Sequence, residues 1–150
     1  MYEWLVALGG ASANLLFAGM FAARVVAPRW GRPLGFVGVA MAIPLAAAAA
    51  VALTSGQDAW AVVLPLVFVA FALGEAVVDL LLPFEIRRTR WLWPYLLAFY
   101  LAQWAVIGAA FIASRAAGFA VLATYFVCLA ATAWSYRRVG HGPSRSSRAT

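Results

Sequence analysis

Five long apolar runs constrain this sequence more than any other feature. A helix needs about 20 predominantly apolar residues to cross the hydrocarbon core of a bilayer. Runs close to this length are bounded by charged residues, Pro or Gly and cover residues 4–26, 34–54, 59–82, 91–113 and 119–136. The pattern predicts an all-α membrane protein, a bundle of five transmembrane helices.

The composition agrees with lipid as the main solvent of the folded chain. Hydrophobic residues make up 66% of the sequence and charged residues only 11%, whereas a soluble domain has about 25% charged residues. Too few polar side chains are present to cover a water-exposed surface. We therefore expect a multi-pass protein of the cell's inner (cytoplasmic) membrane, with the lipid bilayer as its partner.

The arginines predict the orientation. All basic residues are Arg, and all except Arg115 fall in the segments 24–32, 87–90 and 137–148. Five spans put these segments on one side, so the positive-inside rule gives an N-out/C-in topology. Residues 1–138 are expected to form the transmembrane domain, and residues 139–150 a polar cytoplasmic tail without stable structure.

Several kinds of chemistry are disfavoured by the residues that are scarce. Cys128 is the single cysteine and His141 the single histidine, so neither a redox pair nor a metal site with several His or Cys ligands is expected. The net charge of +6 is better explained by anionic headgroups than by nucleic acid. We predict no metal, no cofactor and no nucleic-acid partner.

Two acidic residues inside the third apolar run are the main anomaly. Glu75 and Asp79 are spaced i and i+4, so both project from one face of a helix. A charged carboxylate near the bilayer centre costs roughly 3 kcal/mol on insertion scales, and such residues are functional candidates by default. We take Glu75 and Asp79 as candidate catalytic residues.

Aromatic and amide side chains at helical spacing are expected to face these acids. We predict that they line a cavity and bind an apolar substrate. The candidate substrate-binding residues are Asn14, Phe17, Phe21, Phe71, Tyr100, Gln103, Trp104 and Tyr125. Aromatic stripes at this spacing also arise from ordinary packing.

Two structural explanations for the acids stay open beside the functional one. Asp79 is at a depth where it can pair with Arg24 or Arg137 near the cytoplasmic interface. Glu75 can be protonated and hydrogen-bonded to Asn14 or Gln103, which would hold helices together.

Buried acids among aromatic side chains suit the protonation of an apolar alkene. A dry site favours the neutral carboxyl as general acid, and aromatic faces stabilise cations. The chain is small and has five predicted spans. In these features, and in Glu75, Asp79 and the aromatic stripes, it resembles the small bacterial membrane-bound terpene cyclases. The resemblance implies a metal-independent, type II (protonation-initiated) cyclisation of an isoprenoid-bearing substrate. In the similar fungal meroterpenoid cyclases the two acids come from distant spans, so the role of Asp79 stays open.

Two other functions fit the same residues. Glu75 and Asp79 can serve as the protonatable sites of a small proton-coupled carrier. The chain can also be a non-enzymatic scaffold subunit whose carboxylates only contribute to packing. The sequence predicts neither the substrate nor the oligomeric state.

Overall fold

The computed structural model describes residues 1–81 and 92–139, without the side chains of residues 31–32, 78–81, 92 and 139. Every regular element in these ranges is helical. They are α1 (Tyr2–Val26), the 3-10 turn η1 (Pro28–Trp30), α2 (Gly31–Ala40), α3 (Ala42–Thr54), α4 (Ala59–Leu81), α5 (Leu92–Ala113) and α6 (Arg115–Val139).

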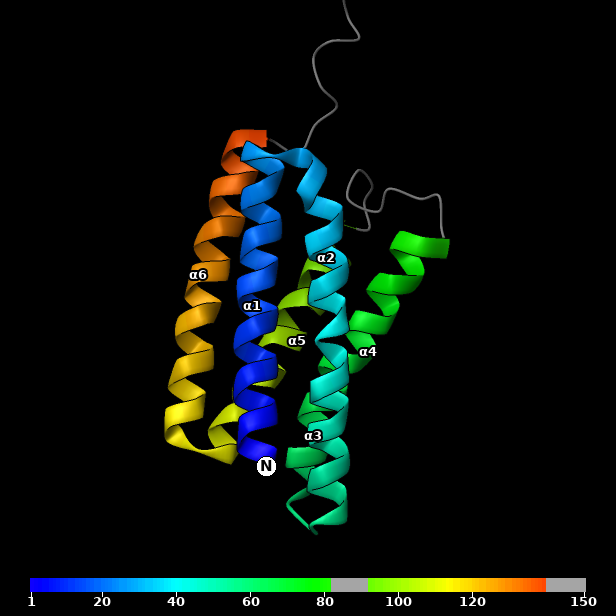
Figure 1. Cartoon of the computed structure of the whole chain (residues 1–150), viewed down its shortest axis with the longest axis vertical. Helices are drawn as coiled ribbons and strands as arrows, with labels where there is room; N and C mark the ends of the chain where they lie inside the picture. The colour runs from blue at the N-terminus through cyan, green and yellow to red at the C-terminus, as the bar shows by residue number, and fades with distance from the viewer. Residues whose placement is uncertain (82–91, 140–150) are drawn as a thin grey trace, which may run out of the picture.

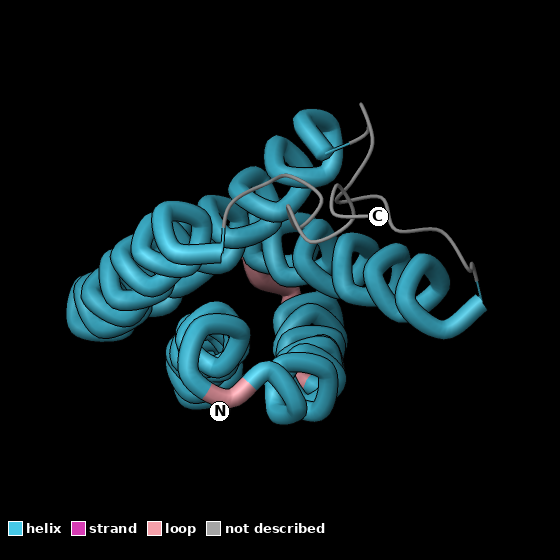
Figure 2. The backbone as a smooth tube through the Cα atoms, turned by 90° about the horizontal axis from the view of Figure 1, so that it is seen from above, coloured by secondary structure: helices cyan, strands magenta, loops and turns pink. Residues whose placement is uncertain are grey.

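Helix α1 lies at the centre of the bundle. It packs along α6 and also contacts α2, α3 and α5, while α3 packs on α4, α4 on α5 and α5 on α6. Figure 1 shows α1, α6 and the α2–α3 pair nearly parallel to the long axis, with α4 inclined to them. Figure 2 shows the same helices from above. The first apolar run of the sequence therefore forms the core element.

The expected five spans are confirmed as helices of suitable length and composition. In the described ranges, five segments are long and apolar enough to cross a membrane: Tyr2–Val26, Pro28–Thr54, Ala59–Val77, Trp93–Ala113 and Arg115–Arg138. The orientation of the bundle in a bilayer stays a prediction. Residues 140–150 of the predicted tail lie outside the described residues.

The second span is broken at Met41, where the sequence predicted one continuous span. Pro44 follows in the first turn of α3. Proline has no N–H, and its ring clashes with the carbonyl four residues earlier, which here belongs to Ala40. The chain tightens instead, and the Met41 N–H bonds the Gly38 carbonyl at 3.2 Å.

Pro65 interrupts the hydrogen bonding of α4 without ending the helix. It leaves the Ala61 carbonyl without its usual N–H donor. The hydroxyl of Tyr2, from α1, donates to this carbonyl at 3.1 Å in a buried position. A side chain from the first span thereby completes the backbone bonding of the third.

Helix α6 begins at Arg115, earlier than the expected start at Phe119. Ser114 is its N-cap, because the Ser114 Oγ accepts a hydrogen bond from the Ala117 N–H at 3.1 Å. Gly118 lies in the first turn, where a Cβ would clash with the Phe111 ring. The absent side chain lets α5 and α6 turn sharply and pack against each other.

Candidate functional site

Glu75 is directed into the bundle by the packing of α4. Phe68 and Ala72 on the same face are fully buried, whereas Leu73 and Val77 on other faces are 60% and 47% exposed. Glu75 is only 7% exposed. The helix therefore presents a carboxyl group to its protein neighbours in a place where apolar residues would be the usual choice.

Tyr95 of α5 is a hydrogen-bond partner of Glu75. Its hydroxyl donates a hydrogen bond to the Glu75 Oε1 at 2.8 Å. Tyr95 is not among the site residues predicted from the sequence. Tyr95 and Phe99 are one helical turn apart, however, which puts both rings on one face of α5. The bond joins α4 and α5 across the segment of residues 82–91, which lies outside the described residues.

Aromatic rings from three helices extend from this pair into the core. The Phe71 ring lies 6.1 Å from Tyr95 and 5.7 Å from Phe99, measured between centroids. Phe99 in turn contacts Phe17 at 5.4 Å and Phe21 at 6.2 Å, both nearly edge to face. These separations are typical of favourable aromatic pairs. Phe17, Phe21, Phe71, Tyr95 and Phe99 are called the aromatic cluster below.

Three further rings border the aromatic cluster. Tyr100 lies 5.3 Å from Phe99, and Phe68 lies 6.4 Å from Phe17. Tyr136 of α6 is 6.3 Å from Phe21.

Trp104 and Tyr125 pair with each other at 5.7 Å, but Trp104 is 55% exposed. Of the predicted substrate-binding rings, Trp104 therefore lies largely on the outside of the described bundle.

A cationic side chain lies at the same end of the bundle. The Arg24 guanidinium carbon is 4.9 Å from the centre of the Phe21 ring, within the range of a cation–π contact. The Arg24 Nη2 is also 3.8 Å from the Met20 sulfur. Arg137 and Arg138, in the last turn of α6, are exposed.

The two predicted amide residues lie deep in the bundle but do not bond Glu75. Asn14 is 0% and Gln103 1% exposed. The Asn14 Nδ2 donates to the Val121 carbonyl and to the Thr124 Oγ1, both at 3.1 Å. Asn14 therefore ties α1 to α6, and the prediction that it binds Glu75 is wrong.

The remaining predictions for this region have different outcomes. The Asp79 side chain lies outside the described residues, so its pairing with Arg24 or Arg137 stays a prediction. Over the described ranges, no group of three or more His, Cys, Asp or Glu is placed to hold a metal ion.

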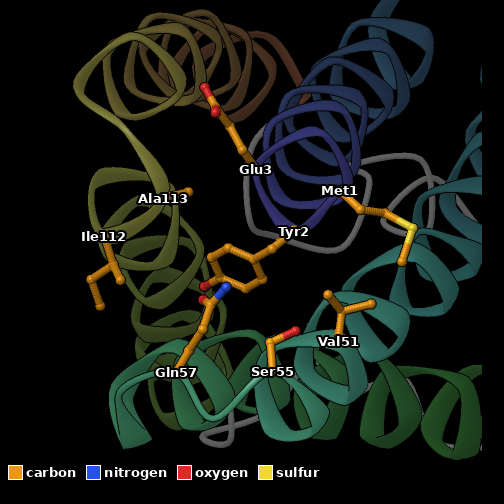
Figure 3. A pocket seen from close by; sticks show the side chains of 8 residues that line it. All are labelled: Met1, Tyr2, Glu3, Val51, Ser55, Gln57, Ile112 and Ala113. Carbon is orange, nitrogen blue, oxygen red and sulfur yellow. The ribbon is translucent and has the colours of Figure 1, made fainter.

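A separate pocket lies at the opposite end of the bundle, beside the N-terminus. It has a volume of about 550 Å³ and is lined by Met1, Tyr2, Glu3, Val51, Ser55, Gln57, Ile112 and Ala113. Figure 3 shows the Tyr2 ring directed toward Gln57 and the Glu3 carboxylate pointing elsewhere. That carboxylate accepts a 2.6 Å hydrogen bond from the Ser114 hydroxyl. No candidate residue from the sequence lies in this pocket.

The fold and the site have the features of a multi-pass helical membrane protein with a buried acid, Glu75, beside an aromatic cluster. No family model, curated protein or solved structure matches the chain. The resemblance to membrane-bound terpene cyclases stays a prediction.

Proposed function

We propose that this chain is an intramembrane enzyme that protonates an apolar, alkene-bearing substrate of the isoprenoid type. The reaction is a type II cyclisation, with Glu75 as the proton donor. We place the protein in the inner membrane with its N-terminus outside, because Arg24, Arg29, Arg137 and Arg138 share the end of the bundle near Glu75.

The hydrogen bond between Tyr95 and Glu75 carries this proposal. It occupies one carboxyl oxygen, Oε1, at 2.8 Å, which orients the other oxygen, Oε2. A general acid must hold its proton toward the substrate. We assign the transferable proton to the Glu75 carboxyl group.

The aromatic cluster supplies what the next step requires. Addition of the Glu75 proton to a C=C bond uses the π electrons to form a C–H bond and leaves a carbocation. A second alkene of the same molecule then forms a C–C bond, and loss of a proton to the Glu75 carboxylate ends the reaction. Reactant and product are isomers, so no oxidant or reductant is consumed. The half-buried rings of Phe71 and Tyr95 would stabilise the passing charge.

An apolar substrate can approach this site from the lipid. Phe71, Tyr95 and Tyr100 are half-buried, so part of each ring lies outside the packed core. Leu73, Val77 and Leu97, near them on α4 and α5, are exposed. In a bilayer these surfaces face acyl chains, which resemble an isoprenoid in polarity.

A reconstitution experiment tests the proposal. The purified protein in liposomes is incubated with linear isoprenoid alcohols and their terminal epoxides, and mass spectrometry searches for products of unchanged mass and altered retention. The wild type is expected to form such an isomer and Glu75→Gln to lose at least 100-fold of the rate, in line with a lost general acid. Glu3→Gln is the matched control. Glu3 lies at the end of the bundle opposite to Glu75, so this variant should keep full activity.

The same liposomes distinguish the main alternative. A proton-coupled carrier would show uptake driven by a pH gradient and would leave every substrate chemically unchanged. Flux that is lost in Glu75→Gln, without any isomer, would replace the enzyme proposal by the carrier. Absence of both activities in the wild type would favour a scaffold subunit.

A further inference from the structure

The buried amides of Asn14 and Gln103 lie on α1 and α5, between two contacts that join these helices. Two contacts fix the register of these antiparallel helices. A Cβ on Gly10 would lie 2.6 Å from the Val106 Cγ1, and the Phe17 and Phe99 ring centroids are 5.4 Å apart.

Between these two contacts the helix faces determine which residues meet. On α1, residues 10, 14 and 17 follow one another on one face, and on α5 residues 99, 103 and 106 do the same. Because the helices run in opposite directions, Asn14 and Gln103 occupy the same level. They lie one turn from the Phe17–Phe99 contact.

The hydrogen bonding of Asn14 fixes which of its atoms is left over. The Thr124 hydroxyl donates to the Val121 carbonyl at 2.8 Å, so the Thr124 Oγ1 acts as an acceptor toward Asn14. Both groups that Asn14 meets on α6 are thus acceptors, and only its Nδ2 can bond them. The Asn14 Oδ1 must therefore point elsewhere.

That oxygen and one nitrogen of Gln103 have no hydrogen-bond partner among the described residues. The Asn14 Oδ1 is a free acceptor and the Gln103 Nε2 a free donor, and both atoms are buried. Leaving such a group unpaired costs about 1–3 kcal/mol, and buried polar side chains in folded proteins nearly always have a partner. An acceptor and a donor at one level can both be satisfied by a single group that donates and accepts.

We propose that Asn14 and Gln103 form a binding site for a single hydroxyl group in the middle of the bundle. A hydroxyl donates its proton to the Asn14 Oδ1 and accepts a hydrogen bond from the Gln103 Nε2. A carbonyl or ether oxygen satisfies only Gln103. The hydroxyl belongs either to an apolar alcohol that enters from the lipid or to a water molecule.

This site is distinct from the acid site. The Phe17–Phe99 contact lies beside the amide pair, and Phe71 and Tyr95 lie beyond it on the way to Glu75. The proposal does not rest on the enzymatic function, since it follows from hydrogen bonding alone. It holds equally for a carrier or a scaffold subunit.

Thermal unfolding of the detergent-solubilised protein tests the site through the sign of one mutation. Gln103→Met keeps a side chain of similar length and removes the amide. If a hydroxyl is bound, the substitution breaks a hydrogen bond and lowers the melting temperature. If both atoms are unpaired, it removes a buried unsatisfied donor and raises the melting temperature. Gln57→Met, at an exposed glutamine, is the matched control and should leave the melting temperature unchanged.

Added ligands distinguish the two sources of the hydroxyl. Dodecan-1-ol and its methyl ether are compared at equal concentration, because the ether can accept but not donate. A rise in the wild-type melting temperature with the alcohol only, lost in Gln103→Met, identifies an alcohol site. A lowered melting temperature in Gln103→Met with no difference between the two ligands identifies bound water. The proposal is overturned if Gln103→Met does not lower the melting temperature and alcohol and ether act alike on the wild type.

Discussion

The Tyr95 hydroxyl donates a hydrogen bond to the Glu75 Oε1 at 2.8 Å and so links the end of α4 to the beginning of α5. Glu75 is 7% exposed, and a bond to a buried carboxyl is worth more than a bond on the surface. The pair therefore serves two purposes in this account. It holds two helices together, and it orients the carboxyl group that we propose as the proton donor.

Replacing Tyr95 by Phe should show how much the hydrogen bond contributes to stability beyond the packing of the ring. The ring stays beside Phe71, but the Glu75 Oε1 loses its donor, so we expect a loss of about 1–3 kcal/mol in the free energy of unfolding. Denaturant titration of the detergent-solubilised protein measures it. Tyr100→Phe is the control, because Tyr100 makes no hydrogen bond in the described ranges. Equal stability of the two variants would argue against the bond.

The Tyr2–Ala61 bond predicts a coupling between Tyr2 and Pro65. Tyr2→Phe should leave the Ala61 carbonyl unpaired and cost about 1–3 kcal/mol. Pro65→Ala restores the N–H that an α-helix directs at this carbonyl. In the Pro65→Ala background, Tyr2→Phe should therefore cost clearly less. A double-mutant cycle measures the difference, and a cost that is the same in both backgrounds would contradict the proposed role of Tyr2.

Two glycines should respond to alanine in opposite directions. At Gly10 a Cβ would lie 2.6 Å from the Val106 Cγ1, whereas at Gly74 nothing lies within 4 Å. Gly10→Ala should push α1 from α5 and destabilise the bundle by about 1–3 kcal/mol. Gly74→Ala should stabilise α4 by about 0.5–1 kcal/mol through helix propensity. Melting temperatures of both variants check this, and a shift of the same sign in both would contradict the packing described.

Phe99 should be the most sensitive member of the aromatic cluster. Its ring is 3% exposed and contacts Phe17, Phe21, Phe71 and Tyr100. Phe99→Ala opens a cavity among these rings, with an expected cost of about 3–5 kcal/mol. Phe126→Ala is the control, since Phe126 is 58% exposed and should cost much less. Unfolding in denaturant compares the two, and similar losses would show that the cluster contributes little.

The sequence predicted the spans well because the length of an apolar run is itself the physical requirement for crossing a bilayer. It predicted the break at Met41 poorly. Pro44 was visible, but a single proline can kink, end or be absorbed by a helix, as Pro65 is in α4. Which of these happens depends on whether the freed carbonyl finds another donor. In α4 this donor is Tyr2, which comes from another span and could not be assigned from the local sequence.

The site was predicted in part for a similar reason. The cost of a carboxyl group in an apolar run identified Glu75 without any structure. Its partner could not be identified in this way, because the residue of α5 that meets Glu75 depends on how the two helices are inclined to each other. Helix α4 is inclined to the other helices (Figure 1), and this inclination brings its end to Tyr95. Asn14 likewise bonds α6, whose register the sequence does not reveal.

Isotope transfer from solvent tests the central claim, that Glu75 donates a proton to the substrate, most directly. The wild type, Glu75→Gln and Glu3→Gln are reconstituted in D2O with linear isoprenoid alcohols. Each cyclised product is returned to H2O, so that its hydroxyl loses deuterium and only carbon-bound deuterium is counted by mass spectrometry. A carboxyl group exchanges its proton with solvent, so the account predicts one deuterium per cyclised product with the wild type and Glu3→Gln, and no product with Glu75→Gln. Labelled product from Glu75→Gln at the wild-type rate would contradict it.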